Sequence, residues 1–231
     1  MENLIKEIFN KYEIKLTNDQ IEKFVEYYKL LVEWNEKFNL TAITEFKDVV
    51  VKHFLDSVLP YKEIKDNSTL IDIGTGAGFP GIPLKIINNS LNITLVDSLN
   101  KRITFLNEVI NKLQLKNITA IHSRCEDIAK TSKRESFDYV VSRAVAKLNT
   151  LSEYCAPLVK NGGTFIAYKS EGSQEELDIS KNAFNLLNLK LEKILNYNIE
   201  NNTRNILFIK KFNTIKSIYP RDKNKPKTNP L

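Results

Sequence analysis

The stretch from Leu70 to Pro83 reads LIDIGTGAGFPGIP and holds four of the chain's seven glycines directly after an apolar run. Glycine lets the backbone turn sharply and lets a ligand approach without a Cβ in the way. In sheets of parallel strands, ligands bind beyond the carboxyl ends of the strands. The stretch therefore predicts a strand that ends in a ligand-binding loop. A helix should begin near Pro80, because proline is tolerated in a first helical turn.

Two glycine spacings overlap in this loop. Gly76, Gly78 and Gly81 match the G-x-G-x-x-G turn of dinucleotide-binding proteins, whereas Gly74, Gly76 and Gly78 match G-x-G-x-G with Asp72 in front. A dinucleotide would bring an anionic pyrophosphate to the helix N-terminus, and Asp72 would repel it. S-adenosylmethionine carries a sulfonium and an ammonium, which a nearby carboxylate attracts. The charge of Asp72 favours the methyl donor, with a nicotinamide-dependent oxidoreductase as the alternative.

Strand-forming runs alternate with helical stretches after residue 68, which predicts right-handed βαβ crossovers and a parallel sheet covered on both faces. The last two runs are separated only by a turn around ENNTR (200–204) and predict an antiparallel hairpin. The expected fold is α/β and Rossmann-like, with a mostly parallel seven-stranded sheet. The expected strands are 69–74, 92–97, 117–123, 137–144, 162–169, 191–199 and 205–211.

The first 66 residues predict a helical extension. Thr17 and Gln20 have the spacing of a capping box, and a second helix beginning at Phe46 should end before Pro60. We expect an extension over 1–66, a core over 67–212 and a basic tail over 213–231. The apolar face predicted for the first long helix consists of Ile21, Phe24, Val25, Tyr28, Leu31 and Val32.

Composition and charge narrow the class of protein. The chain of 231 residues is 42% hydrophobic and 27% charged, and it contains neither an apolar leader nor an uncharged apolar run of membrane length. Its two cysteines form no C-x-x-C motif and its two histidines are isolated. We therefore expect a cytoplasmic protein without a metal site or a membrane partner.

The excess positive charge is concentrated at the C-terminus. The formal net charge is +6, and residues 209–231 hold seven of the 34 basic residues but one of the 28 acidic residues. The rest of the chain therefore has equal numbers of both signs. A basic tail on a neutral body indicates a polyanionic partner, and the alternative is a solubilising tail. Lys210, Lys211 and Arg221 are candidate contacts to that partner.

Residues after the second and third strands complete the expected donor site. Asp97 ends the second strand, where a carboxylate accepts hydrogen bonds from ribose hydroxyls. Glu126 or Asp127 can accept from the adenine amine, although Asp127 also suits a helix N-cap. Cys125 is expected to be a small packing residue, because no proline accompanies it as in cysteines that attack pyrimidines.

Arg143 lies at the end of the fourth strand, where the methyl group would be transferred. Amine-directed methyltransferases carry an Asn/Asp-Pro-Pro-aromatic stretch here, but this chain has Ser142-Arg143-Ala144-Val145. A guanidinium only donates, so Arg143 can hold a guanine acceptor edge, a phosphate, the carboxylate of the donor or a core carboxylate. His53 and Asp56 share a helix face and either cover the donor cleft or form a surface pair.

The absence of an acid–base motif favours an acceptor that loses no proton. Guanine N7 has a free lone pair, so its methylation requires only placement against the sulfonium, an effect worth roughly 7–11 kcal/mol in favourable cases. We therefore assign no catalytic residue. A non-catalytic RNA-binding module is a further alternative.

Several segments together resemble the bacterial 16S rRNA guanine-N7 methyltransferases, the RsmG or GidB family. The resemblance is carried by WNEKFNLTAIT, KHFLDSVLP, IDIGTGAGFPGIPLKI, VDSLNKRITFL, SRAVAKLNTLSEYCAPLVKNGG and YPRDKNKPKTNPL, which span nearly the whole chain.

This resemblance implies a class I methyltransferase fold, S-adenosylmethionine as donor, and 16S rRNA or the small ribosomal subunit as partner, with one guanine of the 530 loop as acceptor. It implies donor contacts at Gly74, Phe79, Cys125, Glu126 and Arg143. The chain departs from the family at Asn224, where many members have glycine, and at Thr228, where lysine is common.

Overall fold

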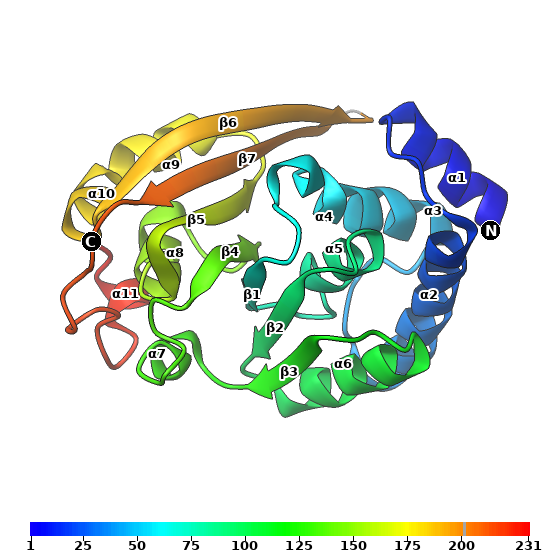
Figure 1. Cartoon of the computed structure of the whole chain (residues 1–231), viewed down its shortest axis with the longest axis horizontal. Helices are drawn as coiled ribbons and strands as arrows, with labels where there is room; N and C mark the ends of the chain where they lie inside the picture. The colour runs from blue at the N-terminus through cyan, green and yellow to red at the C-terminus, as the bar shows by residue number, and fades with distance from the viewer. Residues whose placement is uncertain (201) are drawn as a thin grey trace.

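The sheet has the order β3-β2-β1-β4-β5-β7-β6 and forms the centre of the molecule (Figure 1). The computed structural model describes residues 1–200 and 202–231. Strands β1 to β5 are parallel, and β7 runs antiparallel between β5 and β6. The expected mostly parallel seven-stranded sheet is confirmed, as is the antiparallel pairing of the last two strands. Strand β7 begins at Asn202, inside the predicted turn of residues 200–204, and residue 201 lies outside the described residues. The strands are β1 (Thr69–Ile73), β2 (Asn92–Asp97), β3 (Ile118–His122), β4 (Phe137–Arg143), β5 (Val159–Lys169), β6 (Leu189–Ile199) and β7 (Asn202–Lys211).

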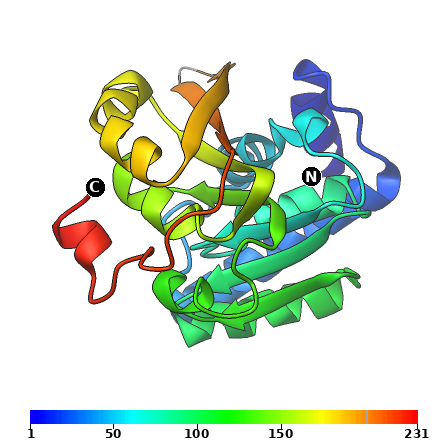
Figure 2. The ribbon, with the colours of Figure 1, turned by 60° about the vertical axis from the view of Figure 1, so that its left-hand side comes forward.

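Helices cover both faces of the sheet (Figure 2). Successive β1 residues point to opposite faces, as the pleat requires. Leu70 packs with the N-terminal helices, α5 and α6, whereas Ile71 and Ile73 pack with α7 to α10. The helices are α1 (Glu2–Lys11), α2 (Asn18–Phe38), α3 (Phe46–Val49), the π-helix η1 (Val50–Leu55), α4 (Asp56–Val58), the 3₁₀-helix η2 (Tyr61–Glu63), α5 (Gly81–Ile87), α6 (Asn100–Lys112), α7 (Cys125–Ile128), α8 (Leu148–Cys155), α9 (Ser173–Ile179), α10 (Lys181–Leu186) and α11 (Lys225–Thr228).

The strand order creates a switch point between β1 and β4. From β1 the chain adds β2 and β3 on one side, and then crosses back to add β4 on the other side. Neighbouring loops diverge at such a point, which leaves a crevice beyond the carboxyl ends of the strands. Here the diverging loops begin at Gly74 and at Ala144.

Helix α2 packs a different stripe against the core from the one predicted. Its fully or nearly buried side chains are Ile21, Phe24, Tyr27, Leu30 and Leu31. Val25, Tyr28 and Val32 are only half-buried. The prediction used the hydropathy of the side chains alone. In the folded chain the face that carries Tyr27 packs against the core, because the Tyr27 hydroxyl can donate to a backbone carbonyl there. One apolar cluster joins this helix to β1, so the extension shares a core with the sheet.

The segment predicted as one helix from Phe46 to Pro60 is helical but changes its winding. It begins as α3, widens into η1 and closes as α4 before Pro60. Short π segments often mark functional positions. This one carries His53 and lies next to Asp56.

The basic C-terminal tail is docked on the body of the protein. Ile215 and Tyr219 are buried in the second apolar cluster, and Pro226 is buried in α11. Apolar side chains therefore fix the path of the tail. Among the helices of residues 1–200 and 202–231, none combines the length and hydropathy that crossing a bilayer requires.

The capping box at α2 is confirmed, and it gives a stability prediction. Thr17 Oγ1 accepts from Gln20 N at 3.3 Å, and Gln20 Oε1 accepts from Thr17 N at 2.9 Å. Thr17→Ala should lower the free energy of unfolding by about 1 kcal/mol, as measured by urea denaturation. Thr44→Ala, at an exposed position, is the control, and an equal loss in both variants would contradict this role.

Candidate functional site: two cavities that meet at Ala144

A cavity of about 290 Å³ lies at the carboxyl ends of β1, β2 and β4. Its lining residues come from four loops that are far apart in the sequence: Gly74, Val96, Asp97, Ser98, Arg102, Ser123, Cys125, Ala144 and Val145. We call this the donor cavity. The switch point between β1 and β4 brings these loops together, as the sequence predicted.

Gly74 lets the floor of the donor cavity form. Its φ is +70°, and a Cβ there would come within 2.5 Å of Val145 Cγ2. Nothing lies within 4 Å of a Cβ built on Gly76, so the loop backbone is open on that side. The loop can therefore receive a ligand at close range.

Asp72 supports the glycine loop and is not among the residues that line the donor cavity, so its predicted contact with the donor stays a prediction. Its side chain is fully buried. Oδ2 accepts from Thr75 Oγ1 at 2.7 Å and from Gly81 N at 2.8 Å, which ties the loop to the start of α5. Burial raises the pKa of this carboxyl to about 7. Asp72 is thus a positioning residue for the glycine loop.

Tyr27 is a second support that sequence reasoning missed. Its buried hydroxyl donates to the carbonyl of Ala77 in the glycine loop. The tyrosine lies 50 positions upstream, and its place on α2 gave no local signal of this contact. The N-terminal extension therefore holds the ligand loop directly.

Asp97 is placed as predicted, at the end of β2 on the cavity wall, with 3% of its surface exposed. Oδ1 accepts from Leu99 N at 2.9 Å, and Oδ2 accepts from Gly76 N at 2.9 Å and Arg102 Nη1 at 3.0 Å. A carboxylate has about four acceptor sites. One site is left for a hydroxyl of a ligand.

Cys125 lines the donor cavity at the start of α7, and Glu126 follows it. Burial and the neighbouring Glu126 raise the pKa of the Cys125 thiol to about 12. The thiol therefore stays protonated and cannot act as a nucleophile. Its small size suits the wall of a cavity, as expected.

A second cavity of about 420 Å³ shares Ala144 with the donor cavity. We call it the acceptor cavity. Ala144 has a φ of +57°, an uncommon conformation for a residue with a Cβ. The lining residues are Ile43, Lys52, His53, Asp56, Arg143, Ala144, Tyr168, Lys169, Ser170, Glu176, Arg204 and Ile206.

Arg143 is held at the mouth of the acceptor cavity by the η1–α4 segment. Nη1 donates to Asp56 Oδ2 at 2.7 Å and to the Lys52 carbonyl at 3.1 Å, and Nη2 contacts His53 Nδ1 at 3.2 Å. A guanidinium has five N–H donors, so two are left for a ligand. Asp56 also accepts from Arg204 Nε at 3.0 Å. His53 and Asp56 thus line the acceptor cavity, not the donor cavity, and bind Arg143, and Asp56 is buried, so they do not form the alternative surface pair.

His53 is neutral in this arrangement. Its Nδ1 lies 3.2 Å from both Arg143 Nη2 and the Lys52 carbonyl, and its Nε2 lies 3.0 Å from Thr41 Oγ1. Burial, with the Arg143 charge next in importance, lowers the pKa of His53 to about 4. The imidazole stacks on Phe79 with ring centroids 4.6 Å apart. Phe79 is 6% exposed, and its ring centroid lies 5.2 Å from the Arg143 guanidinium. Its predicted contact with the donor stays a prediction.

The structure does not bring Lys210, Lys211 and Arg221 to either of the two cavities. Because β7 runs antiparallel to β5, its last residues lie at the opposite edge of the sheet. Lys210 lines a separate cavity there, and the fully buried Lys211 pairs with Glu135. The Arg221 guanidinium is bound to the buried Glu153 carboxylate at 2.7 Å.

The fold is that of class I S-adenosylmethionine-dependent methyltransferases. A SAM-dependent methyltransferase from Aquifex aeolicus superposes with a TM-score of 0.54 at 16% identity, covering 70% of this chain and 92% of that one. M. jannaschii TYW2 in complex with AdoMet superposes with a TM-score of 0.54 at 16% identity, covering 68% and 77%.

The chain belongs to the GidB family, described as rRNA small subunit methyltransferase G, whose family model matches residues 20–207. A ribosomal RNA small subunit methyltransferase G from Lachnoclostridium phytofermentans is 52% identical, covering 94% of this chain and 91% of the relative. The protein of the same name from Clostridium beijerinckii is 48% identical, covering 94% and 93%. The family confirms the methyl donor, so the dinucleotide interpretation of the glycine loop was wrong.

The contacts of His53 predict its titration. Because the folded pKa is about 4, below the ordinary value of 6.5, the ring should stay neutral through pH 5 in the folded protein. Stability contributed by the neutral ring is lost as pH falls from 6.5 toward 4. An NMR titration of the ring protons measures this, and a folded-state midpoint near 6.5 would contradict the assignment.

The position of Asp72 predicts how its loss affects ligand binding. Because the carboxylate acts through the loop, Asp72→Asn should weaken S-adenosylmethionine and S-adenosylhomocysteine by the same factor. A direct attraction for the sulfonium would weaken the charged donor more than its neutral product. Calorimetric titration of both ligands distinguishes these outcomes.

Proposed function

We propose that this methyltransferase transfers a methyl group from S-adenosylmethionine to N7 of one guanine in the 530 loop of 16S rRNA, in the cytoplasm. The observation that carries the proposal is the junction of two cavities at Ala144 in a chain of this family. The donor cavity has the glycine loop and the carboxylate that suit a nucleoside. The acceptor cavity has two arginine side chains that are held by the Asp56 carboxylate. The partner is 16S rRNA, either free or in the small subunit.

The donor cavity fits the methyl donor by its backbone and by its spare acceptor. A Cβ at Gly74 would collide with Val145, so the space exists only because this residue is glycine. The unused acceptor site of Asp97 suits a ribose hydroxyl, and the Cys125–Glu126 pair lies at the start of α7 beside the cavity. Bound S-adenosylmethionine supplies an electrophilic methyl group on its sulfonium.

The acceptor cavity fits a base that needs orientation rather than deprotonation. Arg143 and Arg204 share the Asp56 carboxylate, which fixes both guanidiniums at the cavity wall. His53 has both ring nitrogens engaged and stays neutral. These residues offer donors to the acceptor atoms of a substrate, such as guanine O6, and leave N7 without a competing proton transfer. Alignment of N7 with the methyl group supplies the rate enhancement.

A direct assay tests the substrate. The purified protein is incubated with labelled S-adenosylmethionine and either small subunits or free 16S rRNA from cells lacking the gene, and N7-methylguanosine is mapped by chemical cleavage. We expect one modified guanine in the 530 loop. Methylation of tRNA or DNA without rRNA methylation would overturn the substrate assignment.

Arg143 gives a second test of the mechanism. Arg143→Lys replaces a planar fork by a single ammonium, which cannot serve Asp56, Lys52 and His53 together. We expect methyl transfer to fall at least tenfold, a loss of about 1.4 kcal/mol in transition-state stabilisation. Arg124→Lys, at an exposed position, is the matched control. Equal activity of the two variants would contradict the role of Arg143.

A further inference from the structure

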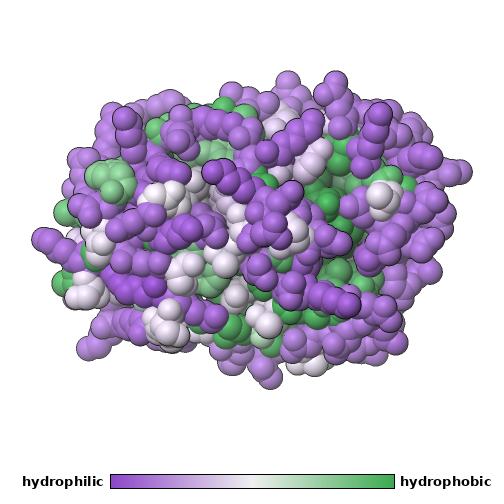
Figure 3. Space-filling view, viewed as in Figure 1, coloured by the Kyte–Doolittle hydropathy of each residue, from purple (hydrophilic) through white to green (hydrophobic). Residues whose placement is uncertain are grey.

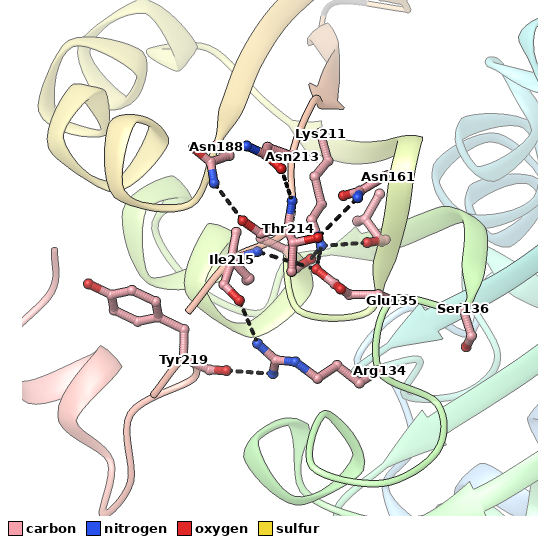
Figure 4. A network of polar contacts seen from close by, with 12 residues as sticks. Arg134, Glu135, Ser136, Asn161, Asn188, Lys211, Asn213, Thr214, Ile215 and Tyr219 are labelled. Atoms are coloured by element: carbon pink, nitrogen blue, oxygen red, sulfur yellow. Dashed lines mark hydrogen bonds and ion pairs between the residues drawn. The ribbon is translucent and has the colours of Figure 1, made fainter. Parts of the chain in front are cut away.

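The basic tail returns along α8 toward the rim of the two cavities. Its first part crosses the amino edge of the sheet, where Arg134 Nη1 donates to the Tyr219 carbonyl at 2.7 Å and Nη2 to the Lys216 carbonyl at 3.1 Å. Figure 4 shows this guanidinium reaching the tail backbone, with Glu135 and Lys211 beside it. Arg134 thus holds the first part of the tail in place at the amino edge of the sheet.

Two further contacts fix the tail at successive positions on α8. Arg221 donates from its backbone N at 2.8 Å and from Nε at 2.9 Å to Glu153 Oε1, and from Nη2 at 2.7 Å to Oε2. The Glu153 carboxylate is fully buried, so this bidentate pair is screened little by salt. Three residues nearer the start of α8, Thr150 Oγ1 donates to the Pro226 carbonyl at 2.8 Å. The tail therefore runs toward the N-terminal end of α8, which follows Ala144 and Val145.

The anchored tail presents lysines and not arginines to solvent. Pro226 is buried, while its neighbours Lys225 and Lys227 are exposed, as is Lys223. Asp222 is bound to Lys130 and is the one acid among residues 213–231. The cations at Lys211 and Arg221 are already neutralised by Glu135 and Glu153. The excess charge of the chain is thus displayed by lysines held beside α8.

We propose that Lys223, Lys225 and Lys227 form a phosphate-binding surface that holds the RNA backbone beside the N-terminal end of α8. The proposal rests on the proposed function for the identity of the RNA. The lysine ammonium groups are single charges on flexible side chains, and they suit the phosphates of an RNA backbone, whose binding requires no recognition of bases. Figure 3 shows one face of the molecule, on which hydrophilic residues prevail and hydrophobic residues form patches between them. The buried Glu153–Arg221 pair positions this surface and does not itself contact RNA.

The test removes charge without removing the tail. The variant K223Q/K225Q/K227Q is compared with K6Q/K15Q/K116Q, which changes three exposed lysines elsewhere on the molecule. Fluorescence anisotropy measures binding of a 16S rRNA fragment spanning the 530 loop over a range of salt concentrations. The slope of log affinity against log salt should become shallower by about 2 in the tail variant, at roughly 0.7 per phosphate in single strands. The control should keep the wild-type slope, and both variants should bind S-adenosylhomocysteine as the wild type does.

An unchanged slope in the tail variant would overturn the proposal. Failure of the proposed function has a different signature, because RNA binding would then depend on the tail while no guanine is methylated. Vesicles of phosphatidylcholine and phosphatidylserine are tested in parallel. Binding to them that depends on the tail lysines, together with an unchanged RNA slope, would assign the surface to membranes and also overturn the proposal.

A second variant tests whether the lysines must be held in place. Glu153→Gln keeps every lysine but removes the buried charge that binds Arg221. We expect faster proteolysis within residues 216–227 and a higher KM for RNA, with donor affinity unchanged. A KM equal to that of the wild type, with the tail released, would contradict the positioning role of this pair.

Discussion

The Asp56 carboxylate is the interaction on which the acceptor side of this molecule depends. It lies at the start of α4, and it binds Arg143 from β4 and Arg204 from β7. Three segments that are distant in the sequence therefore meet at one buried anion. Removing it would leave two partly buried cations without their counter-charge, an arrangement that costs more than the pair itself contributes. Asp56 also sets the distance between the N-terminal extension and the carboxyl edge of the sheet.

On the donor side, too, a buried carboxylate holds the groups that shape the cavity. Asp72 binds Thr75 and Gly81 from below, and Tyr27 binds the loop from α2. Both acids are therefore used to place backbone and guanidinium groups, and neither needs to touch the reacting atoms. Such preorganisation suits a reaction in which orientation supplies most of the acceleration. The extension is part of the site because it supplies a support to each cavity.

Predictions from the sequence succeeded where the signal was local. Short apolar runs separated by helical stretches predicted the strands, because a strand buried on both faces of a parallel sheet is apolar at nearly every position. The glycine spacing and Asp97 at the end of β2 predicted where the cavity at the strand ends lies, because both follow from the position of a loop at a strand end. The sequence-based predictions failed where the role of a side chain depends on its ion-pair partner within the chain. Arg221 and Lys211 look like free cations in the sequence, and only their ion pairs with Glu153 and Glu135 in the folded chain show that they are neutralised.

The sequence by itself determined the class of fold, the methyl donor loop, the capping box at Thr17 and the concentration of positive charge at the C-terminus. These are properties of short segments, and backbone preferences and charge counts suffice to read them. The tertiary structure decided that Asp72 faces the loop, that His53 and Asp56 bind Arg143, and which lysines of the tail are displayed. These outcomes depend on contacts between residues up to about a hundred positions apart, such as His53 with Arg143. Such pairs are set by the packing of whole elements, and no local pattern encodes them.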